Sequence, residues 1–114
     1  MQATDKIWLN GDLVDWPEAR VHVASHGLHY GTGVFEGIRC YATDQGPAVF
    51  RLRDHLRRLE ASAGLLYMRL PYTVEELRRA THELVQVNGL SECYIRPIAF
   101  FGYGELGVHT GSNP

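Results

Sequence analysis

The segment from His26 to Arg39 combines glycines, aromatic side chains and an arginine, a mixture that suits the binding of a small anionic ligand. Glycine lacks a Cβ atom, so its backbone can adopt positive φ angles and can approach a ligand closely. Arginine offers a planar fork of N–H donors that matches a carboxylate or a phosphate. The segment therefore predicts close contact between backbone and ligand, with Arg39 as an anion-binding side chain.

Two segments with the composition of strands, residues 33–41 and 93–101, predict that further side chains share this site. Side chains alternate between the two faces of a strand. One face would hold Phe35, Gly37, Arg39 and Tyr41 on the first segment, and Tyr94, Arg96, Ile98 and Phe100 on the second. If these faces align, two arginines converge, and such a pair favours a carboxylate ligand between them. The alternative is that each arginine forms a structural ion pair, for which Glu36 and Glu92 are the candidates.

A further cation, Arg58, occupies a position near the buried edge of a predicted helix. It directly precedes Leu59, which belongs to an apolar helical stripe. An arginine at such an edge can bury its aliphatic stem and extend its guanidinium toward an anion beneath the helix. The alternative is that residues 54–59 form only a solvated helix face.

Several other chemistries are not supported by the sequence. The glycines of residues 31–37 do not have the G-x-G-x-x-G spacing, and no strand precedes them, so a dinucleotide-binding fold is rejected. His26 and His29 have no carboxylate at metal-ligand spacing, so we expect ordinary hydrogen-bonding histidines and no metal site. Lys6 is the only lysine and lies in a polar amino-terminal segment. Chemistry that needs a buried lysine must therefore come from elsewhere.

Composition limits the class of protein. The chain has 114 residues, 45% of them hydrophobic, and a formal net charge of −2, which predicts one domain with a modest core. That charge gives no reason to expect nucleic acid or a membrane surface as a partner. Cys40 and Cys93 have no C-x-x-C spacing, so we expect free thiols in a reducing compartment. No apolar run of membrane-spanning length and no secretory signal is present, which predicts a cytoplasmic protein.

The expected elements follow from periodicity and turn chemistry. Asn10-Gly11 between two apolar arms predicts a hairpin, and Thr73 with Glu76 predicts a capping box at the start of a helix. The predicted order is a hairpin over residues 6–16, a second hairpin over 33–51, helices over 52–66 and 73–87, and a strand over 93–101. In that last strand Pro97 indicates an edge position or a bulge. The fold class is α+β, an antiparallel β-sheet with two helices packed on one side.

With these pieces placed, the chain resembles the amino-terminal domain of the branched-chain amino acid aminotransferases, which are fold-type IV enzymes that use pyridoxal 5′-phosphate (PLP). The phrase Tyr30-Gly-x-Gly-Val-Phe-Glu-Gly-Ile-Arg39 is typical of that family and its near relatives. Its combination with Tyr94-Ile-Arg-Pro97 favours the branched-chain branch. The likeness also includes the opening Ile7-Trp-Leu-Asn-Gly11 and the helix that carries His55 and Arg58, so it covers essentially the whole chain.

The resemblance implies a role for each polar site residue. Arg58 would bind the phosphate of PLP, Tyr94 would hydrogen-bond the substrate carboxylate, and Arg96 would receive the distal carboxylate of glutamate. Arg39 would support the same wall. The implied reaction moves the amino group of L-leucine, L-isoleucine or L-valine to the cofactor and then to 2-oxoglutarate.

The resemblance also implies an apolar pocket and an oligomer. Phe35, Gly37 and Tyr30 would line the pocket for the branched side chain. Tyr30 and Val108 would reach into the site of the neighbouring subunit, because family members are at least homodimers. An apolar pocket with one cation at its end can accept both leucine and glutamate.

The resemblance divides the chain into a domain over residues 1–101 and the start of an interdomain linker over 102–114. The carboxy-terminal domain that carries the cofactor-binding lysine would be absent, so we expect the parent enzyme to be active and this fragment to be inactive. Within the same fold, a D-amino acid aminotransferase or an aminodeoxychorismate lyase is the alternative. From a different class, the chain is a non-catalytic oligomerisation or anion-binding module.

Overall fold

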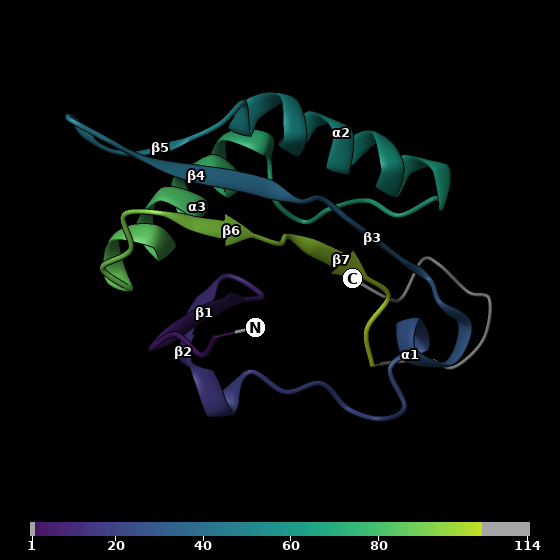
Figure 1. Cartoon of the computed structure of the whole chain (residues 1–114). Coiled ribbons are helices and arrows are strands. Elements are labelled where there is room, and N and C mark those ends of the chain that lie inside the picture. Colours follow the sequence, from purple (N-terminus) through teal and green to yellow (C-terminus); the bar gives the residue numbers. More distant parts are fainter. Residues whose placement is uncertain (1, 104–114) are drawn as a thin grey trace.

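A computed structural model describes residues 2–103 of the chain. From its first hairpin the chain runs to a short helix, α1, and then returns along β3 and β4 (Figure 1). The strands are β1 (Lys6–Leu9), β2 (Asp12–Asp15), β3 (Gly33–Phe35), β4 (Ile38–Thr43), β5 (Gly46–Val49), β6 (Cys93–Ile95) and β7 (Ile98–Phe100). The helices are a 3-10 turn at Trp16–Glu18, α1 (His26–Tyr30), α2 (Leu52–Leu65) and α3 (Val74–Val87). The α+β class predicted from the sequence is confirmed.

The strands form antiparallel pairs that break at one point. β5, β4 and β6 form a three-stranded sheet, while β3 pairs with β7 and β1 pairs with β2. One register continues across the break, because Ile38 lies opposite Ile95 and Phe35 lies opposite Ile98. The residues between include Pro97, which has no N–H to donate to a neighbouring strand. The single strand predicted over 93–101 is therefore two short strands.

The two long helices cover one face of the three-stranded sheet. A core cluster joins that face to both helices through Ile38, Leu52 and Leu56, with Val49, Val74, Leu77 and Ile95 packed against it. The predicted capping box is present, since Thr73 Oγ1 accepts a hydrogen bond from the Glu76 amide (3.1 Å) and Glu76 Oε1 accepts one from the Thr73 amide (3.0 Å). Both helices therefore begin and end close to where the sequence predicts them.

The first hairpin is also confirmed. Asn10 and Gly11 both have positive φ angles, 51° and 92°, as a tight hairpin turn requires. The side chain of Asn88, at the end of α3, binds the backbone of Lys6 in β1, accepting from its N–H at 2.8 Å and donating to its carbonyl at 3.0 Å. This double contact fixes the hairpin against α3.

α1 is a difference between prediction and structure. The sequence predicts a glycine-rich loop here, because five residues that include a glycine have little intrinsic helical propensity. The helix forms because tertiary contacts hold it. The amides of His26 and Gly27 donate to the carbonyls of Gly102 and Phe101, and Gly31 ends the helix with a φ angle of 67°. Within residues 2–103, no helix is long and apolar enough to span a membrane.

Candidate functional site

Alternation along β3 and β4 separates a helix-covered face from an open face. Glu36, Ile38 and Cys40 are buried against the helices, whereas Phe35 and Arg39 are exposed on the other side. The open face is the one on which the sequence places the candidate site residues. It is available to a ligand because neither α2 nor α3 covers it.

Four residues on this open face form what we call the aromatic–arginine cluster: Phe35, Gly37, Tyr94 and Arg96. The guanidinium carbon of Arg96 lies 4.5 Å from the centroid of the Phe35 ring and 5.4 Å from that of Tyr94. Arg96 Nη2 also donates a hydrogen bond to Tyr94 Oη (3.0 Å). The predicted convergence of the two strand faces is confirmed for these residues.

Gly37 is required by the position of Tyr94. A Cβ atom built at Gly37 would lie 2.0 Å from Tyr94 Oη and 2.9 Å from Tyr94 Cζ. Any other residue would have to displace the tyrosine ring. The glycine therefore acts through the close approach of a neighbouring side chain.

Arg39 lies directly opposite Tyr94 in the register of β4 and β6, at the edge of the cluster. The alternative that Arg39 and Arg96 form structural ion pairs with Glu36 or Glu92 is wrong for residues 2–103. Neither arginine has a carboxylate partner there. Neither cation is neutralised by a carboxylate of the described residues, so both are available to a ligand.

Glu36 instead pairs with Arg58 and His55 on α2. Arg58 donates to it twice, from Nε to Oε2 (2.8 Å) and from Nη2 to Oε1 (2.7 Å), and His55 Nδ1 lies 2.8 Å from Oε1. The hydrogen bonds from Arg58 lower the pKa of the Glu36 carboxyl to about 2, His55 acts in the same direction, and burial opposes both. The same pairing raises the pKa of Arg58. Arg58 thus reaches an anion beneath the helix, as its position in the sequence suggests, and among residues 2–103 that anion is Glu36.

The arrangement of Arg58 fits an additional phosphate. Its side chain is 67% exposed, although Glu36 is 4% exposed, so the guanidinium extends from a buried anchor to the surface. Glu36 occupies one edge of the planar group, and the N–H groups of Nη1 and the second N–H of Nη2 have no partner among residues 2–103. A phosphate oxygen is a suitable acceptor for that free edge.

Tyr30 and Val108 are the remaining predicted site residues. Tyr30 is exposed in α1, where its ring packs 4.5 Å from that of His26, and no described contact joins it to the cluster. Val108 lies outside the described residues.

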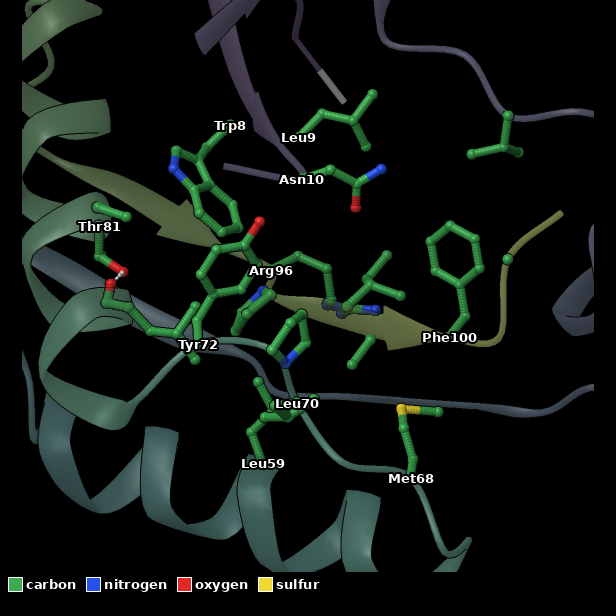
Figure 2. Close-up of a pocket in the computed structure, with 18 of the residues that line it drawn as sticks. Trp8, Leu9, Asn10, Leu59, Met68, Leu70, Tyr72, Thr81, Arg96 and Phe100 are labelled. Atoms are coloured by element: carbon green, nitrogen blue, oxygen red, sulfur yellow. Dashed lines mark hydrogen bonds between the residues drawn. The ribbon is translucent and has the colours of Figure 1, made fainter. Parts of the chain in front are cut away.

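A cavity of about 440 Å³ lies between the first hairpin, the helices and the β6–β7 segment. Figure 2 shows side chains from the first hairpin, from α2 and the segment that follows it, from α3 and from β7 around it. Most of the lining is apolar, and Arg96 is the only one of the proposed substrate-binding residues between positions 2 and 103 that contributes to it. The sequence gives no signal for this cavity, because its walls come from segments that periodicity cannot bring together.

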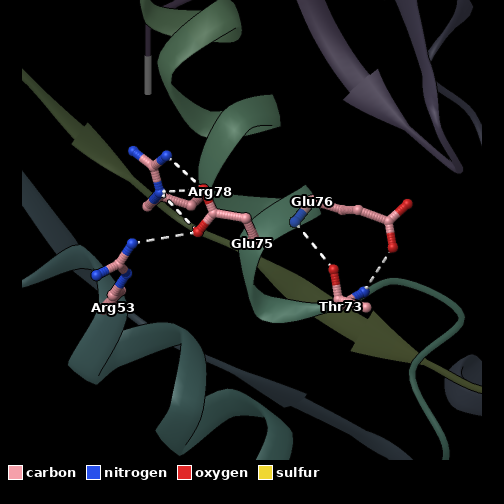
Figure 3. A network of polar contacts seen from close by, with 5 residues as sticks. All are labelled: Arg53, Thr73, Glu75, Glu76 and Arg78. Atoms are coloured by element: carbon pink, nitrogen blue, oxygen red, sulfur yellow. Dashed lines mark hydrogen bonds and ion pairs between the residues drawn. The ribbon is translucent and has the colours of Figure 1, made fainter.

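A second polar network, shown in Figure 3, lies on the helix surface and has a structural role. Glu75 pairs with Arg78 on the same helix and with Arg53 on α2. These groups are exposed and screened by solvent, so each pair contributes little to stability. The network ties α2 to α3 on the surface without forming a site.

Comparison with known proteins places the chain in a family. Residues 33–114 match the model of amino-transferase class IV, and the chain belongs to that family. Its curated relatives include the branched-chain-amino-acid aminotransferase of Escherichia coli (strain K12), which is 48% identical over 105 residues, 92% of this chain. The chain spans about a third of the length of that relative, since the match covers 34% of it.

Solved structures of the same kind superimpose closely. The T.th. branched-chain amino acid aminotransferase complexed with N-(5′-phosphopyridoxyl)-L-glutamate has a TM-score of 0.92 and 47% identity, over 98% of this chain and 39% of that one. The same enzyme complexed with 4-methylvaleric acid has the same TM-score and identity, over 98% of this chain and 39% of that one.

Proposed function

We propose that this chain is the amino-terminal part of a PLP-dependent branched-chain amino acid aminotransferase. The proposed reaction transfers the amino group of L-leucine, L-isoleucine or L-valine to 2-oxoglutarate, giving a branched 2-oxo acid and L-glutamate. The observation that supports it most is the contact between Arg96 and Phe35, which puts a cation and an apolar ring in one open site. The identity to branched-chain aminotransferases along the chain supports the same substrate class.

The cluster explains how one site accepts two kinds of substrate. Phe35 and Gly37 offer an apolar surface to a branched side chain, and Arg96 offers a cation to the distal carboxylate of glutamate. We expect Tyr30 and Val108 to complete this pocket from a neighbouring subunit. The related enzyme is known with N-(5′-phosphopyridoxyl)-L-glutamate and with 4-methylvaleric acid, which is the pairing that this geometry suits.

Tyr94 has the hydrogen-bonding state needed to hold a substrate carboxylate. Its hydroxyl oxygen accepts from Arg96 Nη2, so its own O–H hydrogen is free to be donated. Arg39 lies opposite Tyr94 and adds positive charge beside that position. We propose that Tyr94 binds the substrate carboxylate and that Arg39 supports the side of the pocket on which Tyr94 lies.

We assign Arg58 to the phosphate of PLP, because its exposed guanidinium keeps an edge free that suits a phosphate. When bound, PLP supplies an electron sink for the carbon that loses or gains the amino group. The lysine that the chemistry needs must lie outside this chain. Lys6 is on the first hairpin, where its ammonium pairs with Asp15.

The remaining part of the protein would cover the open face. Phe35, Tyr94 and Ile98 are 60%, 54% and 61% exposed in this chain, which is unusual for neighbouring large apolar groups. We propose that a lysine-bearing carboxy-terminal domain and a second subunit pack over them. Cytoplasmic location and a homo-oligomer are part of the same proposal.

Substrate profiling of the full-length polypeptide that contains this chain tests the proposal. The protein is supplied with PLP and assayed with L-leucine and 2-oxoglutarate, with D-alanine and 2-oxoglutarate, and with aminodeoxychorismate. We expect turnover of L-leucine to exceed that of the other two. Turnover confined to D-alanine or to aminodeoxychorismate would instead assign the chain to another branch of the family. Absence of turnover in all three assays would favour the non-catalytic module.

A further inference from the structure

Glu36 is a buried carboxylate whose two oxygens are both used to hold groups on α2. The residue is 5% exposed, and it accepts from Arg58 twice and lies within hydrogen-bond distance of His55 Nδ1. The Arg58 side chain, by contrast, is largely in solvent. A buried anchor therefore fixes the orientation of an exposed cation.

This pairing selects which edge of the Arg58 guanidinium faces outward. The five N–H groups of a guanidinium lie in one plane, so a carboxylate that occupies the Nε–Nη2 edge leaves the Nη1 side for a ligand. A free arginine of the same exposure would sample many rotamers and would lose that freedom on binding phosphate. Glu36 removes most of that freedom before a ligand arrives.

The negative charge of Glu36 opposes the binding of a phosphate, whereas the positioning of Arg58 favours it. A carboxylate beside Arg58 offsets the positive charge that attracts a phosphate, so electrostatics alone predicts that Glu36 weakens binding. His55 Nδ1 shares the carboxylate and reduces this opposition when it donates a hydrogen bond. If positioning dominates, removal of the Glu36 charge raises the Kd for phosphate; if electrostatics dominates, it lowers that Kd. A measurement of the Kd therefore separates the two effects.

We propose that Glu36 is a positioning residue that holds the Arg58 guanidinium so that its free edge receives the phosphate of PLP. His55 supports this role through its contact with Oε1 of the same carboxylate. The proposal rests on the proposed function, since it requires that Arg58 binds that phosphate. Nothing in the chemistry of Glu36 requires it to touch the cofactor or the substrate.

The test measures cofactor affinity in the full-length polypeptide. The Kd for PLP is determined by equilibrium dialysis of apoprotein, and the Kd for inorganic phosphate by its competition with PLP. Glu36→Gln keeps the shape of the side chain but replaces one acceptor oxygen by a donor that faces Arg58 or His55. We expect it to raise both Kd values about tenfold, with the KM for leucine unchanged at saturating PLP. Unchanged or lower Kd values would overturn the proposal.

Two controls separate positioning from a general loss of structure. Glu75→Gln removes a carboxylate that is also paired with arginines, on the helix surface, and it should leave the Kd for PLP unchanged. In an Arg58→Lys background, Glu36→Gln should have no further effect on the Kd, because the guanidinium that Glu36 orients is gone. A full tenfold effect in that background would contradict the proposal.

A second variant keeps the test valid if Glu36→Gln does not fold. His55→Gln leaves the Glu36–Arg58 pair in place and removes the ring that holds the carboxylate, so we expect a rise of about threefold in both Kd values. No change in either Kd would count against the proposal. Wild-type protein that neither binds PLP nor transfers amino groups refutes the proposed function itself. Active wild-type protein with a normally binding Glu36→Gln variant refutes only the role of Glu36.

Discussion

The amide of Glu36 donates a hydrogen bond to the carbonyl of Pro97 (3.1 Å), at the point where the ladder between the two halves of the sheet is interrupted. Pro97 has no N–H to return, so pairing stops there and resumes in the same register on either side. The alternation of side chains continues through the break. Phe35 and Gly37 therefore lie on the open face while Glu36 turns toward α2. Consecutive residues thus contribute to the proposed substrate pocket and to the proposed phosphate-binding group.

Gly37→Ala is expected to weaken substrate binding. The new Cβ would lie 2.0 Å from Tyr94 Oη, so Tyr94 must rotate out of its contact with Arg96. We expect the KM for leucine and for glutamate to rise at least about tenfold, and the free energy of unfolding to fall by only ~1 kcal/mol, because the ring can move into solvent. Steady-state kinetics and urea unfolding of the full-length protein measure both.

Gly64→Ala is the matched control for this substitution. A Cβ at Gly64, on α2, would meet no atom within 4 Å. Alanine should stabilise the helix by ~0.5–1 kcal/mol and leave both KM values unchanged. Equal kinetic effects of the two substitutions would contradict the role given to Gly37.

Arg96→Gln is expected to separate the two substrates. Loss of the guanidinium removes the cation from the cluster but leaves the Phe35 ring in place. The KM for glutamate should rise about a hundredfold, whereas the KM for leucine should change less than about threefold. Separate half-reactions with each amino acid measure this difference. Arg57→Gln, an exposed arginine on α2, should change neither value. An equal rise for both substrates would show that Arg96 does not select the distal carboxylate.

Acid should destabilise the domain through Glu36. Its pKa is lowered from 4.5 to about 2 by Arg58 and His55, so the unfolded chain binds the proton more readily than the folded one between these values. The contribution to stability is complete above about pH 4.5 and is lost as the pH falls toward 2. Glu36→Gln should be less stable at neutral pH and should lose less stability on acidification. Thermal unfolding from acid to neutral pH measures how the stability of the wild type and of Glu36→Gln depends on pH. The same dependence in both proteins would disprove the role of Glu36 in acid destabilisation.

Thr73→Ala is expected to destabilise α3. It removes the hydroxyl that accepts the Glu76 amide and half of the reciprocal pair that caps the helix. Loss of such a cap costs ~0.5–2 kcal/mol of unfolding free energy. Thr73→Ser keeps the hydroxyl and should stay close to wild type. If urea unfolding gives the same loss for both variants, the cap is not the source of the stability.

The local elements and the faces of the strands can be predicted from residues that are close together in the chain. The Asn10-Gly11 turn, the Thr73 capping box and the apolar stripes of both helices depend on neighbours within a few residues, so composition and spacing are enough to predict them. The twofold period of a strand likewise places Phe35 and Gly37 on one face. These features were confirmed because the physics behind them is local.

Which distant groups meet depends on how the strands and helices pack. Alternation turns Glu36 inward, where a carboxylate needs partners, but it cannot choose between the arginines of β4, of the last strands and of α2. The contact of Arg96 with Phe35, the short helix α1 and the cavity beside the first hairpin depend in the same way on strand register and on the packing of helices. Such distances between residues far apart in the chain are set by the whole core, so no short stretch of sequence contains them.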